Sequence, residues 1–168
     1  RKNIGLVLQE PFLYHGTIAS NIRMYHEELT DEEIRQAAAF VDVADFIESL
    51  PGGYDHPVTE RGSTLSTGQR QLLAFARTIA AQPKILILDE ATANIDQETE
   101  EMIQNSLKKM RQGRTTIAIA HRLSTIQDAD CIYVLDKGKI IESGNHDQLI
   151  ALGGTYKKMY DLQAGMMK

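Results

Sequence analysis

Apolar and polar residues follow two different periods along the chain, and together they predict an α/β fold. Short apolar runs typical of strands occupy residues 4–8, 85–88, 115–120 and 131–135. Helical spacing of apolar residues covers residues 17–50, 72–79 and 97–112. The run at 85–88 is consistent with a strand that is buried on both faces. Strands separated by helices indicate a mostly parallel sheet, which binds ligands at the carboxyl ends of its strands.

Local signals mark where the predicted elements begin and end. Thr30 and Glu33 have the spacing of a capping box at a helix start, and Gly113 stands where a C-terminal cap belongs. Residues 136–139 predict a hairpin turn, and two short helices close the chain. We therefore expect a mainly helical subdomain over residues 12–82 and an α/β part made of residues 1–11 and 83–168.

Composition narrows the class of protein. Hydrophobic residues make up 42% and charged residues 24%, as in an ordinary soluble globular protein. The formal charge of −5 argues against broad, charge-driven binding of nucleic acid. A single cysteine, Cys131, excludes an internal disulfide framework and suits a reducing compartment. No apolar run approaches the roughly 18 residues of a membrane span. The chain starts without Met, so it looks internal, and the lack of a signal peptide says little.

Two adjacent acids, Asp89 and Glu90, follow the buried strand at 85–88. At the carboxyl end of such a strand, the first acid can hold Mg²⁺ and the second can orient an attacking water. The alternative is an acidic turn that caps the next helix, and the residues alone favour neither.

The second candidate is Leu65-Ser66-Thr67-Gly68-Gln69, which opens the helix over 72–79. Ser66 and Gln69 have capping-box spacing, so a well-capped helix start is the simpler interpretation. The other is an anion site, in which Gly68 lets the backbone approach a ligand. His121 and Gln9 each follow a predicted strand, and each by itself is compatible with a structural role.

Taken together and in this order, these motifs resemble the nucleotide-binding domain of ABC transporters over nearly the whole chain. Residues 65–69 resemble the signature motif, and residues 85–89 resemble the Walker B strand. The resemblance implies that Glu90 is the catalytic glutamate, His121 the switch histidine and Gln9 the Q-loop glutamine. It also places Asp96 in the D-loop.

The resemblance extends to exporters of the multidrug and lipid type. It rests on Gln9-Glu10-Pro11-Phe12-Leu13 followed by Gly16-Thr17-Ile18 and Asn21-Ile22, and on Thr59-Glu60-Arg61-Gly62. It implies that Phe12, Glu60 and Arg61 contact the coupling helices of a membrane domain. Without the family, Glu60 and Arg61 would be a solvated charge pair.

Two features depart from the family pattern. No Gly-x-x-x-x-Gly-Lys-Ser/Thr phosphate loop occurs, so we expect the chain to be a P-loop NTPase-like domain without its amino-terminal phosphate-loop part, and inactive alone. Thr67 stands where the family usually has glycine. A weakened signature beside intact Glu90 and His121 resembles one half of a heterodimeric bacterial exporter rather than a homodimer that tolerates Thr67.

The implied activity is hydrolysis of Mg-ATP coupled to export across a membrane. Glu90, His121 and Gln9 would be catalytic, and Asp89 and Gln9 would hold Mg²⁺. Residues 66–69 and Asp96 would bind ATP across a dimer with a second nucleotide-binding domain. The location would be the cytoplasmic face of the cell membrane, which is the inner membrane in a bacterium. The rival interpretations are a soluble ABC ATPase of DNA repair or translation, and a non-catalytic module.

Overall fold

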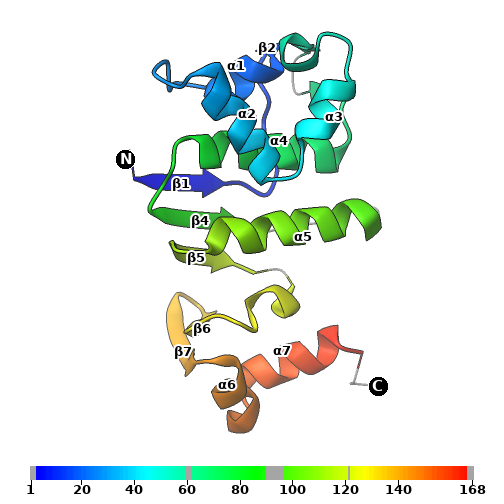
Figure 1. The fold of residues 1–168 in the computed structure, drawn as a ribbon. Helices are drawn as coiled ribbons and strands as arrows, with labels where there is room; N and C mark the ends of the chain where they lie inside the picture. The colour runs from blue at the N-terminus through cyan, green and yellow to red at the C-terminus, as the bar shows by residue number, and fades with distance from the viewer. Residues whose placement is uncertain (1–2, 60–61, 90–96, 121, 166–168) are drawn as a thin grey trace. The chain divides into compact units, whose positions relative to one another are not determined.

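The computed structural model describes residues 3–59, 62–89, 97–120 and 122–165 (Figure 1). The chain divides into two compact units, Arg1–Ile119 and Ala120–Lys168. The first unit combines a parallel sheet with helices, which confirms the predicted α/β class. In the parts of the chain that the structure describes, no helix is both long enough and apolar enough to cross a membrane.

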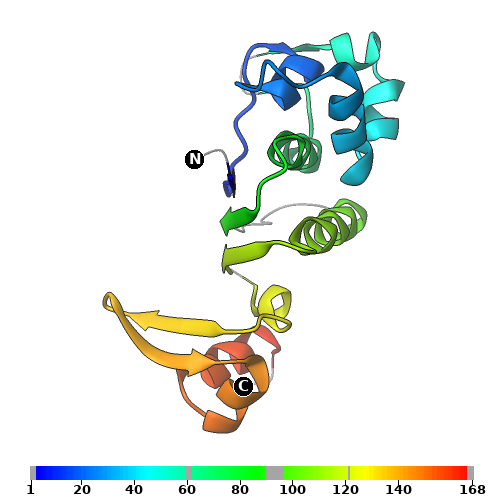
Figure 2. The same cartoon turned by 60° about the vertical axis from the view of Figure 1, so that its left-hand side comes forward.

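A three-stranded parallel sheet forms the centre of the first unit. Its strand order is β1 (Ile4–Val7), β4 (Ile85–Asp89) and β5 (Thr115–Ile119). The register pairs Val7 with Leu88 and Asp89 with Ile119, so all three strands end at the same edge. The helices α4 (Thr67–Ala80) and α5 (Gln97–Arg111) lie on one face of this sheet (Figure 2). The strands predicted at 4–8, 85–88 and 115–120 and the helices predicted at 72–79 and 97–112 are therefore confirmed. The observed ends of each strand lie within a few residues of the predicted ends.

Burial of β4 differs from the expectation that both of its faces are covered. Leu86 and Leu88 are buried, whereas Ile85 and Ile87 are half-buried. The register places Ile87 in one row with its neighbours on β1 and β5, and those neighbours are more than half exposed. Among the described residues, α4 and α5 cover the opposite face, so the expectation holds for one face only.

Short helices and a two-stranded ribbon make up the region between β1 and α4. They are α1 (Ile18–Arg23), α2 (Asp31–Phe40), α3 (Ala44–Ser49) and a 3₁₀ turn, η1 (Gly53–Asp55). The ribbon pairs β2 (Gly16–Thr17) with β3 (Pro57–Val58) in antiparallel fashion. The helical stretch predicted over 17–50 is therefore three helices. The apolar faces of α1 and α2 pack on α4 around a core that includes Ile18, Ile22, Ile34 and Phe75, whereas α3 packs on α2 and η1.

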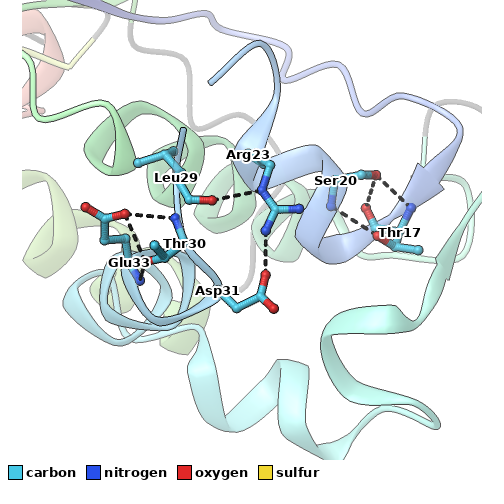
Figure 3. A network of polar contacts seen from close by, with 7 residues as sticks. All are labelled: Thr17, Ser20, Arg23, Leu29, Thr30, Asp31 and Glu33. Atoms are coloured by element: carbon cyan, nitrogen blue, oxygen red, sulfur yellow. Dashed lines mark hydrogen bonds and ion pairs between the residues drawn. The ribbon is translucent and has the colours of Figure 1, made fainter. Parts of the chain in front are cut away.

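Capping boxes set the starts of two of these helices (Figure 3). The Thr30 hydroxyl accepts a hydrogen bond from the Glu33 amide at 3.2 Å, and the Glu33 carboxylate accepts one from the Thr30 amide at 2.8 Å. This confirms the box predicted from sequence. Arg23 joins the two helices, because its guanidinium donates to the Leu29 carbonyl at 3.1 Å and pairs with Asp31.

The second unit is a hairpin with helices packed against it. It comprises η3 (Leu123–Ile126), β6 (Ile132–Asp136), β7 (Lys139–Gly144), α6 (His146–Leu152) and α7 (Thr155–Gln163). Lys137 and Gly138 both have positive φ, as a tight hairpin turn requires, so the predicted turn is confirmed. The Glu142 carboxylate accepts hydrogen bonds from the amides of Tyr156 and Thr155 at the start of α7. These hydrogen bonds lower the pKa of Glu142, and the one from the Tyr156 amide contributes most.

Candidate nucleotide-binding site

The first turn of α4 has the capping box that the sequence predicts. The Gln69 amide donates to the Ser66 hydroxyl at 3.1 Å, and the Ser66 amide donates to the Gln69 side-chain oxygen at 2.9 Å. Ser66 therefore has a structural role in this chain. Capping accounts for the third amide of the helix and leaves the amides of Thr67 and Gly68 at a helix end, where backbone donors lack an intrahelical acceptor. Such an end attracts anions, so the cap and the anion site are compatible.

Thr67 is exposed at the first position of α4. Its hydroxyl accepts a hydrogen bond from the Arg70 guanidinium at 3.1 Å. The same guanidinium donates to the Leu65 carbonyl at 2.6 Å, which ties the approaching loop to the helix. A β-branched residue thus fits the backbone of this chain, and its methyl and hydroxyl groups stand at the helix end.

Gly68 is buried, and the side of its backbone where a Cβ would stand faces helix α5. A Cβ atom added there would lie 2.0 Å from Thr99 Cγ2 and 3.8 Å from Ile103 Cδ1, both on α5. The sequence suggested that this glycine allows a ligand to approach the backbone. The structure adds a reason that sequence reasoning missed, which is the close packing of α4 on α5.

Gln9 and Asp89 are brought to the same edge of the sheet. Asp89 is the last residue of β4, and Gln9 follows the end of β1, which pairs with β4. The last pair of the β1–β4 ladder is Val7 with Leu88, so Gln9 lies two residues beyond that pair and Asp89 one residue beyond it. Asp89 is half-buried and Gln9 is exposed. Glu90, Asp96 and His121 lie outside the described residues.

Phe12 belongs to a segment with two exposed aromatic rings. The Phe12 and Tyr14 side chains are each 44% exposed, and their centroids lie 4.9 Å apart in an edge-to-face arrangement. Leu13, between them, is fully buried and anchors the segment. Glu60 and Arg61 fall outside the described residues, so the structure brings together only part of the predicted coupling surface.

Two polar residues hold this segment: Arg77 was not singled out from the sequence, and Asn21 was noted only as part of the exporter-type pattern, without a role. Arg77, on α4, and Asn21, on α1, bond to its backbone. The signal in the sequence is an arginine within the apolar run Phe75-Ala76-Arg77-Thr78-Ile79. A charged side chain at such a position needs several hydrogen-bond acceptors.

The fold and the motifs at its sheet edge and helix end define the class as an ABC-type nucleotide-binding domain. The sequence model described as "ABC transporter" matches residues 1–93, and the chain belongs to this family. That match confirms the resemblance drawn from the signature and Walker B residues.

Individual relatives agree with this class. The chain is 78% identical, over 99% of its length, to a Streptococcus pneumoniae protein named as an ABC transporter ATP-binding protein, exp8. It is 56% identical, over 98% of its length, to Bacillus subtilis YheH, whose name describes a multidrug resistance ABC transporter ATP-binding/permease protein. It spans 28% and 24% of those two relatives. A solved structure of an ATP-bound bacterial Atm1-family ABC exporter shares 44% identity with a TM-score of 0.88, over 98% of this chain and 29% of that one.

Proposed function

We propose that this chain is part of the ATP-binding and ATP-hydrolysing domain of an ABC exporter. The observation that carries the proposal is the common edge of β1, β4 and β5, where Asp89 ends β4 and Gln9 comes shortly after β1. Ligands bind at this edge in open α/β sheets. The names of the relatives, which describe ATP-binding proteins of ABC transporters, support the same role.

The donor set at the edge fits a magnesium ion. Carboxylate and amide oxygens are ligands that Mg²⁺ accepts, and Mg²⁺ is usually held by one or two protein groups together with substrate phosphates. Asp89 and Gln9 would hold the ion, whose charge would offset that of the ATP phosphates. Glu90 polarises the attacking water, and His121 donates a hydrogen bond toward the γ-phosphate.

The helix end at Ser66–Gln69 caps ATP that is held by a second nucleotide-binding domain, with Asp96 near the dimer contact. Amides at this helix end and the helix dipole favour a phosphate group there. Thr67 adds an exposed β-branched side chain at this contact, and so weakens the site that it completes. The second domain is therefore a non-identical subunit with a glycine-type signature, which completes the competent site around Glu90.

Movement of the dimer reaches a membrane domain through Phe12, Glu60 and Arg61. The exposed aromatic pair of Phe12 and Tyr14 offers an apolar contact of the kind found at the centre of interfaces. Residues 12–82 act as the helical subdomain of this machine, and residues 1–11 with 83–168 act as part of its α/β core. The working position is the cytoplasmic face of a bacterial cell membrane. The relatives' names favour this role over a soluble ATPase of DNA repair or translation.

Turnover of ATP by the full-length protein tests the catalytic assignment. Glu90→Gln should lower steady-state ATPase activity at least about 100-fold, because it removes the carboxylate that polarises water. Glu101→Gln is the matched control, since Glu101 is an exposed acid on α5 that the mechanism does not use. Equal activity of the two variants would refute the assignment of Glu90 and leave the non-catalytic module as the better interpretation.

Subunit composition tests the heterodimer. The full-length protein purified alone should hydrolyse ATP slowly, and the native complex should contain a second, non-identical ABC protein. Full activity of the pure chain as a homodimer, unchanged by Thr67→Gly, would contradict this part of the proposal.

A further inference from the structure

Arg77 makes an unusual set of contacts for a charged residue on a helix that faces the core. Its Nε donates to the Asn21 carbonyl at 2.7 Å, one terminal nitrogen donates to the Phe12 carbonyl at 2.9 Å, and the other donates to Asn21 Oδ1 at 3.0 Å. Its Cζ lies 5.7 Å from the centre of the Tyr14 ring. In the described part of the chain no carboxylate pairs with it.

This arrangement has an energetic consequence. Burial lowers the pKa of the Arg77 guanidinium, while the electrostatic influence of Tyr14 and Tyr25 opposes that shift. A desolvated cation without a counter-charge depends on neutral acceptors in fixed positions. The acceptors here are backbone and amide oxygens of one irregular segment and one short helix. Arg77 and the segment therefore hold each other in place.

Asn21 completes the arrangement from α1. The Tyr14 amide donates to Asn21 Oδ1 at 2.8 Å, and Asn21 Nδ2 donates to the carbonyls of Tyr14 and Thr17, both at 2.9 Å. Together Arg77 and Asn21 engage the Phe12 carbonyl and both backbone groups of Tyr14. The segment lacks regular secondary structure, so these hydrogen bonds pair backbone groups that a helix or a sheet would otherwise pair.

The held segment carries the exposed aromatic pair. Because Leu13 points into the core, Phe12 and Tyr14 both face outward, where they pack edge to face. Hydrogen bonds to the backbone on either side of Leu13 fix where the side chains of Phe12 and Tyr14 leave the chain. A rigid aromatic pair loses little conformational entropy when a partner binds it.

We propose that Arg77 and Asn21 are the positioning residues of the coupling surface, which hold Phe12 and Tyr14 ready to contact a membrane-domain helix. This inference rests on the proposed function, since it assumes that Phe12 contacts that domain. The hydrogen bonds from Arg77 and Asn21 to the segment, called the clamp below, hold this surface. They are separate from the signature motif and from the sheet edge.

The clamp also connects the surface with the helix end that caps ATP. Ser66 is the N-cap of α4, and Arg77 lies eleven positions further along the same helix. At 1.5 Å per residue the two are about 16 Å apart along a continuous helix. Displacement of the Ser66 end therefore carries Arg77, and through its hydrogen bonds the aromatic pair, as one body.

Arg77→Lys in the full-length protein tests the clamp. One ammonium cannot keep the planar set of contacts to Phe12 and Asn21, so the segment should loosen. The matched control is Arg114→Lys, because Arg114 also donates to backbone carbonyls, of Pro83 at 3.0 Å and Met110 at 2.9 Å, without touching the segment. Asn21→Ala is the second variant and should act in the same direction.

Two measurements report on the segment at its exposed residue His15. A spin label on His15→Cys, in a Cys131→Ser background without other reactive thiols, should become more mobile in Arg77→Lys and in Asn21→Ala but not in Arg114→Lys. A photoreactive benzoylphenylalanine at position 15 should crosslink to the membrane-spanning part, with a yield at least about two-fold lower in Arg77→Lys than in Arg114→Lys.

The outcomes separate the clamp from the proposed function. Equal label mobility in all variants would overturn the clamp, and so would a mobile label with an undiminished crosslink. Absence of any crosslink in the otherwise unchanged protein would instead refute the coupling role of this surface, which belongs to the proposed function. If Arg77→Lys and Arg114→Lys lost thermal stability equally and the label mobility did not differ between them, Arg77 would have only a structural role.

Discussion

Gly68→Ala provides a quantitative test of how α4 packs on α5. The added Cβ would lie 2.0 Å from Thr99 Cγ2, whereas ordinary contacts begin near 3.4 Å. The helices must separate or the Thr99 side chain must rotate, and overpacking of this kind costs about 1–3 kcal/mol. Alanine's better helix propensity returns up to about 1 kcal/mol in a helix interior and less at a helix end. We expect a net loss of about 1–2 kcal/mol.

A double-mutant cycle with Thr99→Ala isolates the clash. Without Cγ2, the nearest atoms to the new Cβ are Thr99 Cβ at 3.4 Å and Ile103 Cδ1 at 3.8 Å, both in ordinary contact range. The double variant should therefore be at least about 1 kcal/mol more stable than the sum of the single effects. Thermal unfolding of the full-length protein measures this as the difference in Tm between each variant and the unchanged protein.

The cycle also separates the two roles considered for Gly68. If this glycine served only the approach of a ligand, Gly68→Ala would leave Tm unchanged and would weaken ATP-dependent dimerisation, and Thr99→Ala would rescue neither property. An additive cycle would refute the packing argument.

Two further predictions concern helix starts. Ser66→Ala removes the acceptor for the Gln69 amide and should cost about 1 kcal/mol, measured as a fall in Tm, whereas Ser66→Thr should retain most of the stability. The Glu142 carboxylate, whose pKa is lowered by the Tyr156 and Thr155 amides, stabilises the fold while it is ionised; this contribution is present at neutral pH and is lost as the pH falls below the ordinary value of 4.5. The Tm difference between the unchanged protein and Glu142→Gln should therefore shrink on acidification, and a constant difference would contradict the assignment.

Local signals in the sequence were sufficient for most of the fold. The Thr30–Glu33 box and the turn at Lys137-Gly138 are each specified by residues a few positions apart, so neighbouring residues alone predict them. The run at 85–88 predicted a strand correctly but not the burial of both of its faces. Burial depends on which elements cover a sheet, and periodicity along one strand carries no such information.

Contacts between distant segments could not be predicted. Gly68 and Thr99 lie 31 positions apart in the sequence, and the reason for a glycine appears only when α4 and α5 meet. Likewise Arg77 could be noted as a cation among apolar residues, but its acceptors at Phe12 and Asn21 are 65 and 56 positions away. At the candidate site, the parallel register brings the carboxyl ends of β1 and β4 to one edge, and Gln9 and Asp89 stand at those two ends.

The most direct test of the hydrolytic role of Glu90 is a single-turnover experiment on the full-length protein with its partner. Mg²⁺ and radiolabelled ATP are added at less than one equivalent, and the nucleotide that stays bound is identified over time. We expect the unchanged protein to convert it to ADP, whereas Glu90→Gln should retain it as ATP and Glu101→Gln should behave like the unchanged protein. Conversion to ADP at the same rate in Glu90→Gln would contradict the claim that this chain carries the hydrolytic site.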